Sequence, residues 1–371
     1  MVTSQASRKK QSRNSTIELM RFIFTVGVCL HHFYSTFVDS GPYPFYNGYF
    51  AVEFFFVIGG YFLASSIDKI SNDKPLWQNS LLVIKSRFFK LLIPFYVGHS
   101  ITFILRNLFI QTPSLTQWFI NYISDFSLLT FVRQAGFDYF YGYGHTWYIS
   151  SMFLSFLIIV PLLIHYRKNF IFLAAPVIAT FIFGYMNHEY GKAISDLNRW
   201  SGLFLKGQMR AFADICLGIF LFGVTTSLRK IHFTKAGIAL LSFIEVTCYG
   251  ILFYYMFSDG SVLGRRDYSM LFFLIQAIML SMSNITFTSA LFANKRIIAW
   301  LGQFSLYLYL MHYIVSVNVM PYLLQKIPDL PFPVLIYLFI SFLCSFILWG
   351  ICLLVEKHFL PFLKNVLIVD V

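Results

Sequence analysis

Ten separate stretches of this 371-residue sequence are apolar over the length that a helix needs to cross a lipid bilayer, about 20 residues. They cover residues 17–38, 46–67, 88–110, 146–164, 170–187, 209–228, 236–257, 268–289, 299–320 and 332–355. Hydrophobic residues make up 58% of the chain and charged residues only 12%, whereas an average soluble domain is about 25% charged. A water-soluble fold could not bury so much apolar surface, which excludes soluble enzymes, secreted disulfide scaffolds and disordered proteins. The sequence predicts an all-α polytopic membrane helix bundle of about ten transmembrane helices.

Charge divides the chain into a membrane domain with two short flanks. Residues 1–16 form a basic tail, 17–356 the ten-span domain and 357–371 a second short tail. Most of the Lys and Arg residues between the spans fall on the side of the N-terminus, and such residues accumulate on the cytoplasmic side of membrane proteins. We therefore expect both termini in the cytoplasm. The same rule accounts for the net charge of +12, so we expect the lipid bilayer, and no nucleic acid, as a partner.

The apolar segments themselves indicate neither a signal peptide nor a metal site. The first is too long for the apolar region of a signal peptide and lacks a following cleavage site, so we count it as a span. All five cysteines lie inside apolar segments without metal-ligand spacing, which favours packing residues and no metal.

A stripe of ionisable residues runs along the first span, where charged side chains are costly and usually functional. Arg21 and His32 are 11 positions apart, so they lie about 20° apart around a helix and about 16 Å apart along it. Glu18 and Thr25 flank this stripe, whereas His31 points about 100° away from it. The guanidinium of Arg21 suits the phosphates of a cytoplasmic donor, and the imidazole of His32 suits a general base on a hydroxyl. In the alternative reading, Arg21 pairs with Glu18 and His32 is a packing residue.

Four further stretches accompany this Arg-x10-His spacing. They read GYFAVEFFFVIGGYF at 48–62, RFFKLLIPF at 87–95, RAFADICLG at 210–218 and LGQFSLYLYLMH at 301–312. In this order they resemble the acyltransferase-3 family of ten-helix bacterial integral-membrane O-acyltransferases. The sequence has Glu53 where the family commonly has Asp, Gly59 where Ser is usual and Met311 where Trp is common. The fourth span lacks the paired acids of many members, so the chain resembles the branch that modifies exopolysaccharide and lipopolysaccharide.

The resemblance implies an activity and a setting. It implies an O-acyltransferase of the bacterial inner membrane that takes an acyl group, most commonly acetyl, from cytoplasmic acetyl-CoA. The acceptor would be a hydroxyl of a cell-envelope carbohydrate, such as a lipid-linked oligosaccharide, lipopolysaccharide or exopolysaccharide. His32 would act as the base, or would carry the acyl group transiently.

Several basic and acidic residues are candidates beside this pair. Lys85, Arg87 and Lys90 would bind the phosphates of coenzyme A together with Arg21, although anchoring at the cytoplasmic interface also explains them. Glu53 would be catalytic by orienting His32, or else form a structural ion pair with Arg106 or Arg210. For Arg210 and Asp214, four residues apart, the simplest expectation is a local pair along one helix.

Candidate acceptor residues lie nearer the outer face. Ser305, Tyr309 and His312 share one face of the ninth span, where hydrogen bonding between helices explains them equally well. Trp147 closes the aromatic outer loop 111–145, which would stack on a sugar or belong to the interfacial aromatic belt.

Two other functional classes remain open from the residues alone. A transporter or flippase for an anionic or glycan substrate would also need intramembrane charges and aromatic outer loops. A non-catalytic envelope scaffold would not need the charges inside the spans.

Overall fold

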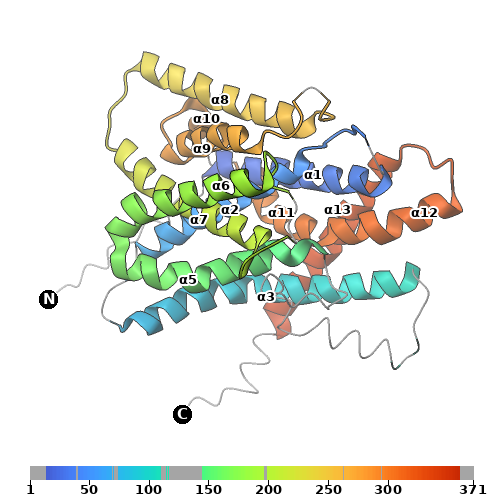
Figure 1. Ribbon diagram of the computed structural model, residues 1–371. Coiled ribbons are helices and arrows are strands. Elements are labelled where there is room, and N and C mark those ends of the chain that lie inside the picture. Colours follow the sequence, from blue (N-terminus) through green and yellow to red (C-terminus); the bar gives the residue numbers. More distant parts are fainter. Residues whose placement is uncertain are drawn as a thin grey trace, which may run out of the picture.

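Long apolar helices lying side by side make up most of the fold, which confirms the all-α expectation (Figure 1). The computed structural model describes residues 14–38, 41–68, 70, 74–109, 114, 116, 144–195, 199–261, 263–293 and 295–359. The expectations on residues 1–13, on residues 117–143 of the aromatic outer loop and on residues 360–371 lie outside the described residues.

The elements follow the apolar segments closely. The α-helices are α1 (Ser15–Phe37), α2 (Ala51–Ile67), α3 (Leu76–Phe109), α5 (Trp147–Asn169), α6 (Ala175–Tyr190), α7 (Lys206–Leu228), α8 (Lys235–Phe257), α9 (Asp267–Ser283), α10 (Phe287–Leu291), α11 (Arg296–Ile314), α12 (Met320–Lys326) and α13 (Pro333–Leu354). The π-helical turns are η4 (Phe170–Ala174), η5 (Val315–Val319) and η6 (Val355–Phe359), and the 3-10 turns are η1 (Gly48–Phe50) and η3 (Gly144–Thr146). Between α6 and α7, β1 (Trp200–Ser201) pairs antiparallel with β2 (Phe204–Leu205).

The number of membrane crossings agrees with the sequence once one break is taken into account. Among the described residues, eight helices are long and apolar enough to cross a membrane. One of the eight covers residues 144–190 as a single helix, but Arg167 has φ 21° and ψ −92°, and α5 and α6 fold back from this point (Figure 1). α9 has only 17 residues. If the helix over 144–190 is divided at Arg167 into two spans, and α9 is added as a further span, the eight long helices become the ten expected spans.

The third span begins earlier than the apolar pattern suggests. α3 starts at Leu76 and runs for 34 residues, about 51 Å, whereas the hydrocarbon core is about 30 Å thick. Lys85, Arg87 and Lys90 therefore lie on the helix itself rather than in a loop before it. The apolar pattern places the start of this span at residue 88, because these three charged residues interrupt the apolar run.

Two glycines allow α2 and α7 to pack backbone to backbone. A Cβ atom built on Gly60 would lie 2.1 Å from the carbonyl oxygen of Ile215, and one on Gly218 would lie 1.9 Å from that of Val57. Close approach through small residues is a common way for membrane helices to associate. This crossing holds the two helices that carry Glu53 and Arg210.

The outer surface of the bundle is apolar as well. Large side chains such as Phe243 on α8 and Phe339 on α13 are 69% and 68% exposed. Apolar surface on this scale would be a liability in water, but it matches the hydrocarbon of a membrane. The molecule is therefore a multi-pass membrane protein.

Candidate functional site

Two adjoining cavities lie between the helices on the side of the chain that the charge distribution assigns to the cytoplasm. The inner cavity has a volume of about 510 Å³, and the other, which we call the vestibule, about 850 Å³. Both cavities are lined by the same five residues where they meet, Arg21, Phe62, Ser66, Lys90 and Leu306. A ligand that enters the vestibule can therefore extend into the inner cavity.

The inner cavity brings together residues from helices that are distant in sequence. Its apolar walls come from α1, α2, α3 and α5, with Val28, Phe55, Leu91, Met152 and Phe156 among them. Five residues that the sequence singled out also line it, namely Arg21, Arg87, Lys90, Ser305 and Tyr309. The cavity thus combines an apolar body with a few polar groups, as ligand sites commonly do.

Arg21 takes part in both of the arrangements that the sequence left open. Its Nη1 lies 3.3 Å from Oε2 of Glu18, so the pair within one helix is present. The side chain nevertheless remains 29% exposed and lines both cavities. Gly302 of α11 leaves room for Glu18, because a Cβ atom at Gly302 would lie 1.9 Å from the Glu18 carboxylate.

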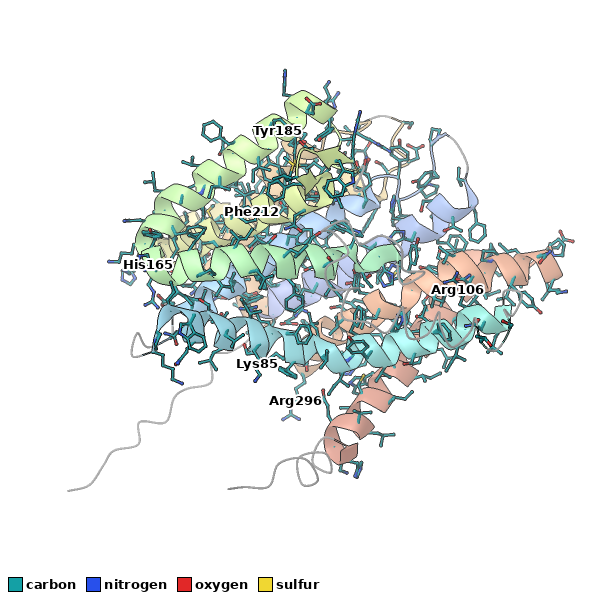
Figure 2. All side chains as sticks on the ribbon, turned by 60° about the horizontal axis from the view of Figure 1, so that its bottom comes forward. Lys85, Arg106, His165, Tyr185, Phe212 and Arg296 are labelled. Carbon is teal, nitrogen blue, oxygen red and sulfur yellow. The ribbon has the colours of Figure 1, made fainter. Side chains whose placement is uncertain are left out.

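The other basic candidates lie in different surroundings. Arg87 lines the inner cavity but donates two hydrogen bonds of 2.8 Å, to the carbonyl of Phe62 and to the hydroxyl of Ser66. Lys90 is exposed and lines both cavities. Lys85 lies on the outer side of α3, with its ammonium 5.7 Å from the ring centre of Phe89, and lines neither cavity (Figure 2).

One cation of the vestibule was not anticipated from the sequence. Arg229, just after α7, lines the vestibule and donates to the hydroxyl of Tyr61 at 3.1 Å and to the carbonyl of Met282. Its charge looked like ordinary cytoplasmic anchoring, and only packing against α2 and α9 turns it toward the cavity.

A cluster of three imidazoles and two phenols lies next to the inner cavity. We call His32, His145, His312, Tyr309 and Tyr313 the histidine cluster. The ring centre of His312 lies 5.3 Å from that of His32 and 5.4 Å from that of His145. Tyr313 lies 5.1 Å from both His32 and His145. Tyr309 lines the cavity and lies 5.9 Å from His312, so His32 is two rings behind the cavity wall.

Hydrogen bonding fixes the tautomer of His312. Its Nδ1 lies 3.1 Å from the carbonyl oxygen of Leu308, and because a carbonyl only accepts, Nδ1 must carry the hydrogen. In the neutral ring, Nε2 is then an acceptor. This buried atom has no hydrogen-bond partner among the described residues. Within the described residues it is therefore an unused hydrogen-bond acceptor, in a ring that packs against His32.

A π-helical turn holds the backbone at His32. The hydroxyl of Ser316, in η5, donates to the carbonyl of His32 at 2.9 Å. The hydroxyl of Thr36, in α1, donates to the same oxygen at 2.7 Å. A π-turn inserts one residue into a helix and is frequent at functional sites. Here it lets α11 reach across to α1 beside the histidine cluster.

Glu53 pairs with Arg210, one of the two partners that the sequence offered for it. Arg210 donates from Nε and Nη2 to the two carboxylate oxygens, both at 2.5 Å, and both side chains are almost completely buried. The guanidinium also lies 5.3 Å from the ring centre of Trp147. Trp147 thus contacts this ion pair, while its neighbour Tyr148 lines the inner cavity.

The expected local pair between Arg210 and Asp214 is wrong. Arg210 reaches across to α2 instead, since the glycine crossing brings the Glu53 carboxylate within bidentate reach. Both carboxylate oxygens of Asp214 are buried and have no hydrogen-bond partner among the described residues.

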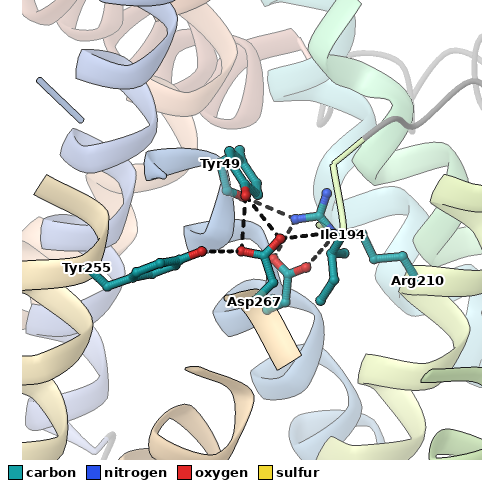
Figure 3. A network of polar contacts seen from close by, with 6 residues as sticks. Tyr49, Ile194, Arg210, Tyr255 and Asp267 are labelled. Carbon is teal, nitrogen blue, oxygen red and sulfur yellow. Dashed lines mark hydrogen bonds and ion pairs between the residues drawn. The ribbon is translucent and has the colours of Figure 1, made fainter. Parts of the chain in front are cut away.

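The ion pair continues into a buried polar network at the outer ends of the helices (Figure 3). Arg210 donates to the carbonyl of Tyr49 at 3.1 Å, and the hydroxyl of Tyr49 donates to Asp267 at 3.0 Å. Asp267 also accepts from Tyr255 and from the amide of Ile194, both at 2.6 Å. Asp267 could not be selected from the sequence, because it directly precedes the apolar run of its span.

Comparison with known proteins gives one family. The model of the acyltransferase domain that defines the acyltransferase-3 family matches residues 14–350, from the N-cap of α1 into α13. A search of the curated proteins and a search of the solved structures each gave no significant match.

Proposed function

This chain belongs to the acyltransferase-3 family, and we propose that it transfers an acetyl group from cytoplasmic acetyl-CoA to a hydroxyl of a cell-envelope carbohydrate. The family makes the protein a membrane acyltransferase, as its five sequence stretches predict. The donor, the acceptor and the bacterial inner membrane are our proposal. The observation that carries it is the continuous pair of cavities, basic in the vestibule and bounded by the histidine cluster at the inner end.

The shape and charge of the cavities suit a coenzyme A thioester. Arg21, Lys90 and Arg229 line the vestibule, where they would bind the phosphates of the donor. The apolar inner cavity would take the uncharged arm that ends in the thioester. Arg87 would hold the inner cavity open beside the vestibule, where it is hydrogen-bonded to Phe62 and Ser66 of α2. These bonds also give it a structural role.

The reaction needs a base at the acceptor hydroxyl. In the proposed step, the hydroxyl oxygen attacks the thioester carbonyl carbon, the new C–O ester bond forms and the C–S bond breaks. His32 takes the hydroxyl proton and returns it to the departing sulfur of coenzyme A. This step requires the reacting groups to pass Tyr309 and reach His32, because His32 itself lines neither the inner cavity nor the vestibule. His312, whose ring centre lies 5.3 Å from that of His32, would hold the His32 ring in place by packing against it. Transient acylation of His32 is the alternative route.

Glu53 has a supporting role in this proposal. It is joined to Arg210 and, through the Tyr49 network, to the outer ends of α8 and α9. It would therefore keep α2, α7, α8 and α9 in register rather than touch the substrate.

Acetyl transfer in sealed vesicles tests the proposal. Purified protein is reconstituted, radiolabelled acetyl-CoA is supplied on the cytoplasmic side, and candidate envelope glycans are supplied on the other side. Label should appear on the glycan with the wild type and with His232→Ala, an exposed histidine in the loop after α7. It should fall at least a hundredfold with His32→Ala. Glycan movement without any acyl donor would instead support a transporter.

A further inference from the structure

A third cavity, of about 510 Å³, lies on the opposite side of the membrane domain. It is formed by the segment after α1 and the segment between α8 and α9, and we call it the outer cavity. The residues that matter to the argument are Tyr43, Tyr46, Asp259, Gly260 and Arg265. None of them was selected from the sequence.

The outer cavity contains both hydrogen-bond donors and acceptors next to aromatic rings. The Arg265 guanidinium lies 5.4 Å from the ring centre of Tyr46 and donates to Ser195 at 3.0 Å, which holds it in place. Asp259 accepts from the hydroxyl and the amide of Ser261. These bonds lower the pKa of Asp259 below its ordinary value, so its carboxylate remains an acceptor at neutral pH.

Hydrogen bonds join the two segments that form this cavity, so its shape follows from the fold. The amide of Tyr46 donates to the carbonyl of Ser258 at 3.2 Å, and the side-chain amide of Asn47 donates to the carbonyl of Gly264 at 3.0 Å. Gly260 has φ +78°, and a Cβ atom there would lie 2.4 Å from the Tyr46 ring. Only glycine combines this backbone conformation with such a close aromatic contact.

Tyr43 of the outer cavity lies next to His31 of α1, and His31 lies next to His32. The ring centre of His31 lies 6.2 Å from Tyr43 and 5.6 Å from Tyr49, and its Nδ1 lies 3.0 Å from the carbonyl of Phe45. The ring of His31 is in turn 5.5 Å from that of His32. The inner cavity approaches His32 from the cytoplasmic side, and the outer cavity approaches it from the other side.

We propose that the outer cavity binds a neutral pyranose unit of the acceptor, with Tyr43 and Tyr46 against its C–H face and Asp259 and Arg265 on its hydroxyls. Carboxylates accept from sugar hydroxyls and guanidinium groups donate to them, while aromatic rings cover the apolar face. One negative and one positive side chain balance each other in the cavity, which favours a neutral sugar over an acidic one. This inference rests on the proposed function, because it takes the acceptor to be a carbohydrate.

Direct sugar binding tests the assignment. Full-length protein in nanodiscs is mixed with the methyl glycosides of glucose, galactose and mannose and with glucuronate, and ligand-observed NMR reports contact. We expect a signal from at least one neutral glycoside, reduced at least fivefold by Asp259→Asn and by Arg265→Gln. Arg266→Gln is the matched control, because this neighbouring arginine lines a separate small cavity with Asn187 and Lys192. Tyr43→Phe, which removes one hydroxyl, serves if the charge variants fail to fold.

The outcomes separate the two proposals. Wild-type protein that turns over acetyl-CoA but gives no sugar signal, or binds glucuronate alone, overturns the neutral-sugar site and leaves the acyltransferase proposal intact. A sugar signal that depends on Asp259 in a protein without acetyl-CoA turnover supports the site and overturns the proposed reaction. A signal that is lost equally in Arg266→Gln also counts against the outer cavity.

Discussion

At the scale of single residues, Arg21 and Glu53 show two uses of charge inside a membrane. Arg21 is partly exposed, is paired with Glu18 along one helix and lines the cavities. Glu53 is fully buried and is paired across helices with Arg210. An exposed cation is free to meet a ligand, whereas a buried bidentate pair already satisfies both partners. The first is therefore suited to substrate binding and the second to stability.

We expect Glu53→Gln to lower the free energy of unfolding by about 3–5 kcal/mol, because it leaves the buried Arg210 charge without a partner. Glu18→Gln, which affects a more exposed pair, should lower it by about 1 kcal/mol or less. The double variant Glu53→Gln, Arg210→Met should recover much of the loss. Thermal and denaturant unfolding in detergent measures all three, and equal effects of Glu53→Gln and Glu18→Gln would contradict the assignment.

Arg21→Ala should raise the KM for acetyl-CoA by about ten- to a hundredfold, since hydrogen bonds to charged groups contribute about 1.5–3 kcal/mol. Arg21→Lys keeps the charge but loses the planar fork, so a smaller rise is expected. Lys90→Ala should also raise the KM.

Lys85→Ala tests whether Lys85 binds the donor, as the sequence suggests, or lies outside the donor site, as the structure shows. Its side chain lies outside both cavities, so the structure predicts a KM within about twofold of wild type. A rise as large as that of Lys90→Ala would restore the grouping of Lys85 with the donor-binding residues.

At the scale of elements, the crossing of α2 and α7 is the contact that aligns the polar interior. Gly60 and Gly218 each lie against a backbone carbonyl of the other helix. This approach brings Glu53 to Arg210, and the π-turn η5 similarly brings α11 to α1 at His32. Small residues and one irregular turn therefore determine which polar groups meet.

Gly60→Ala should greatly destabilise the protein, because its Cβ atom would fall 2.1 Å from a backbone oxygen that cannot move alone. The adjacent Gly59→Ala provides the control, since nothing lies within 4 Å of a Cβ atom at that position. We expect a loss of about 3 kcal/mol or more for the first and little change for the second, measured as unfolding temperature and yield of monodisperse protein. Comparable behaviour of the two variants would refute the close crossing.

At the scale of the whole molecule, cavities lie on both sides of the histidine cluster. The vestibule draws residues from both ends of the chain, from Asn14 before α1 to Glu356 after α13. A ligand there contacts α1, α2, α3, α9, α11 and α13 at the same time. Binding should therefore stabilise the molecule as a unit.

Coenzyme A at a hundred times its Kd should stabilise the folded protein by about 2.7 kcal/mol. The stabilisation should decline as salt rises, because the contacts are between phosphates and exposed cations. Thermal unfolding with and without coenzyme A measures this effect, and wild-type protein should lose more of it at high salt than Lys90→Ala. Stabilisation that is independent of salt would argue against phosphate binding in the vestibule.

The expected orientation can be tested in intact cells. Lys192→Cys and Lys230→Cys each add one thiol at an exposed position in opposite loops, after α6 and after α7. The parent protein, whose five native cysteines lie inside apolar segments, gives the background labelling. A membrane-impermeant maleimide should label the first from outside and should label the second only after the cells are opened. The reverse pattern would invert the topology and, with it, the assignment of the vestibule to the cytoplasm.

The sequence by itself determined the fold class, the approximate spans and the family. Membrane helices must satisfy their own backbone hydrogen bonds, so each span has to be apolar over a fixed length, and that requirement is visible in one dimension. The helical period likewise placed Arg21 and His32 on one face of α1.

Only the tertiary structure decided which polar side chains meet. It assigned Glu53 to Arg210 rather than to His32, and it left Lys85 outside the cavities. It also placed His312 against both His32 and His145. Helix spacing predicts neighbours along one helix, but contacts between helices depend on close approaches such as that of Gly60 and on irregular turns such as η5. In a bundle whose helices are apolar on nearly every side, the pattern of hydrophobic residues does not specify those partners.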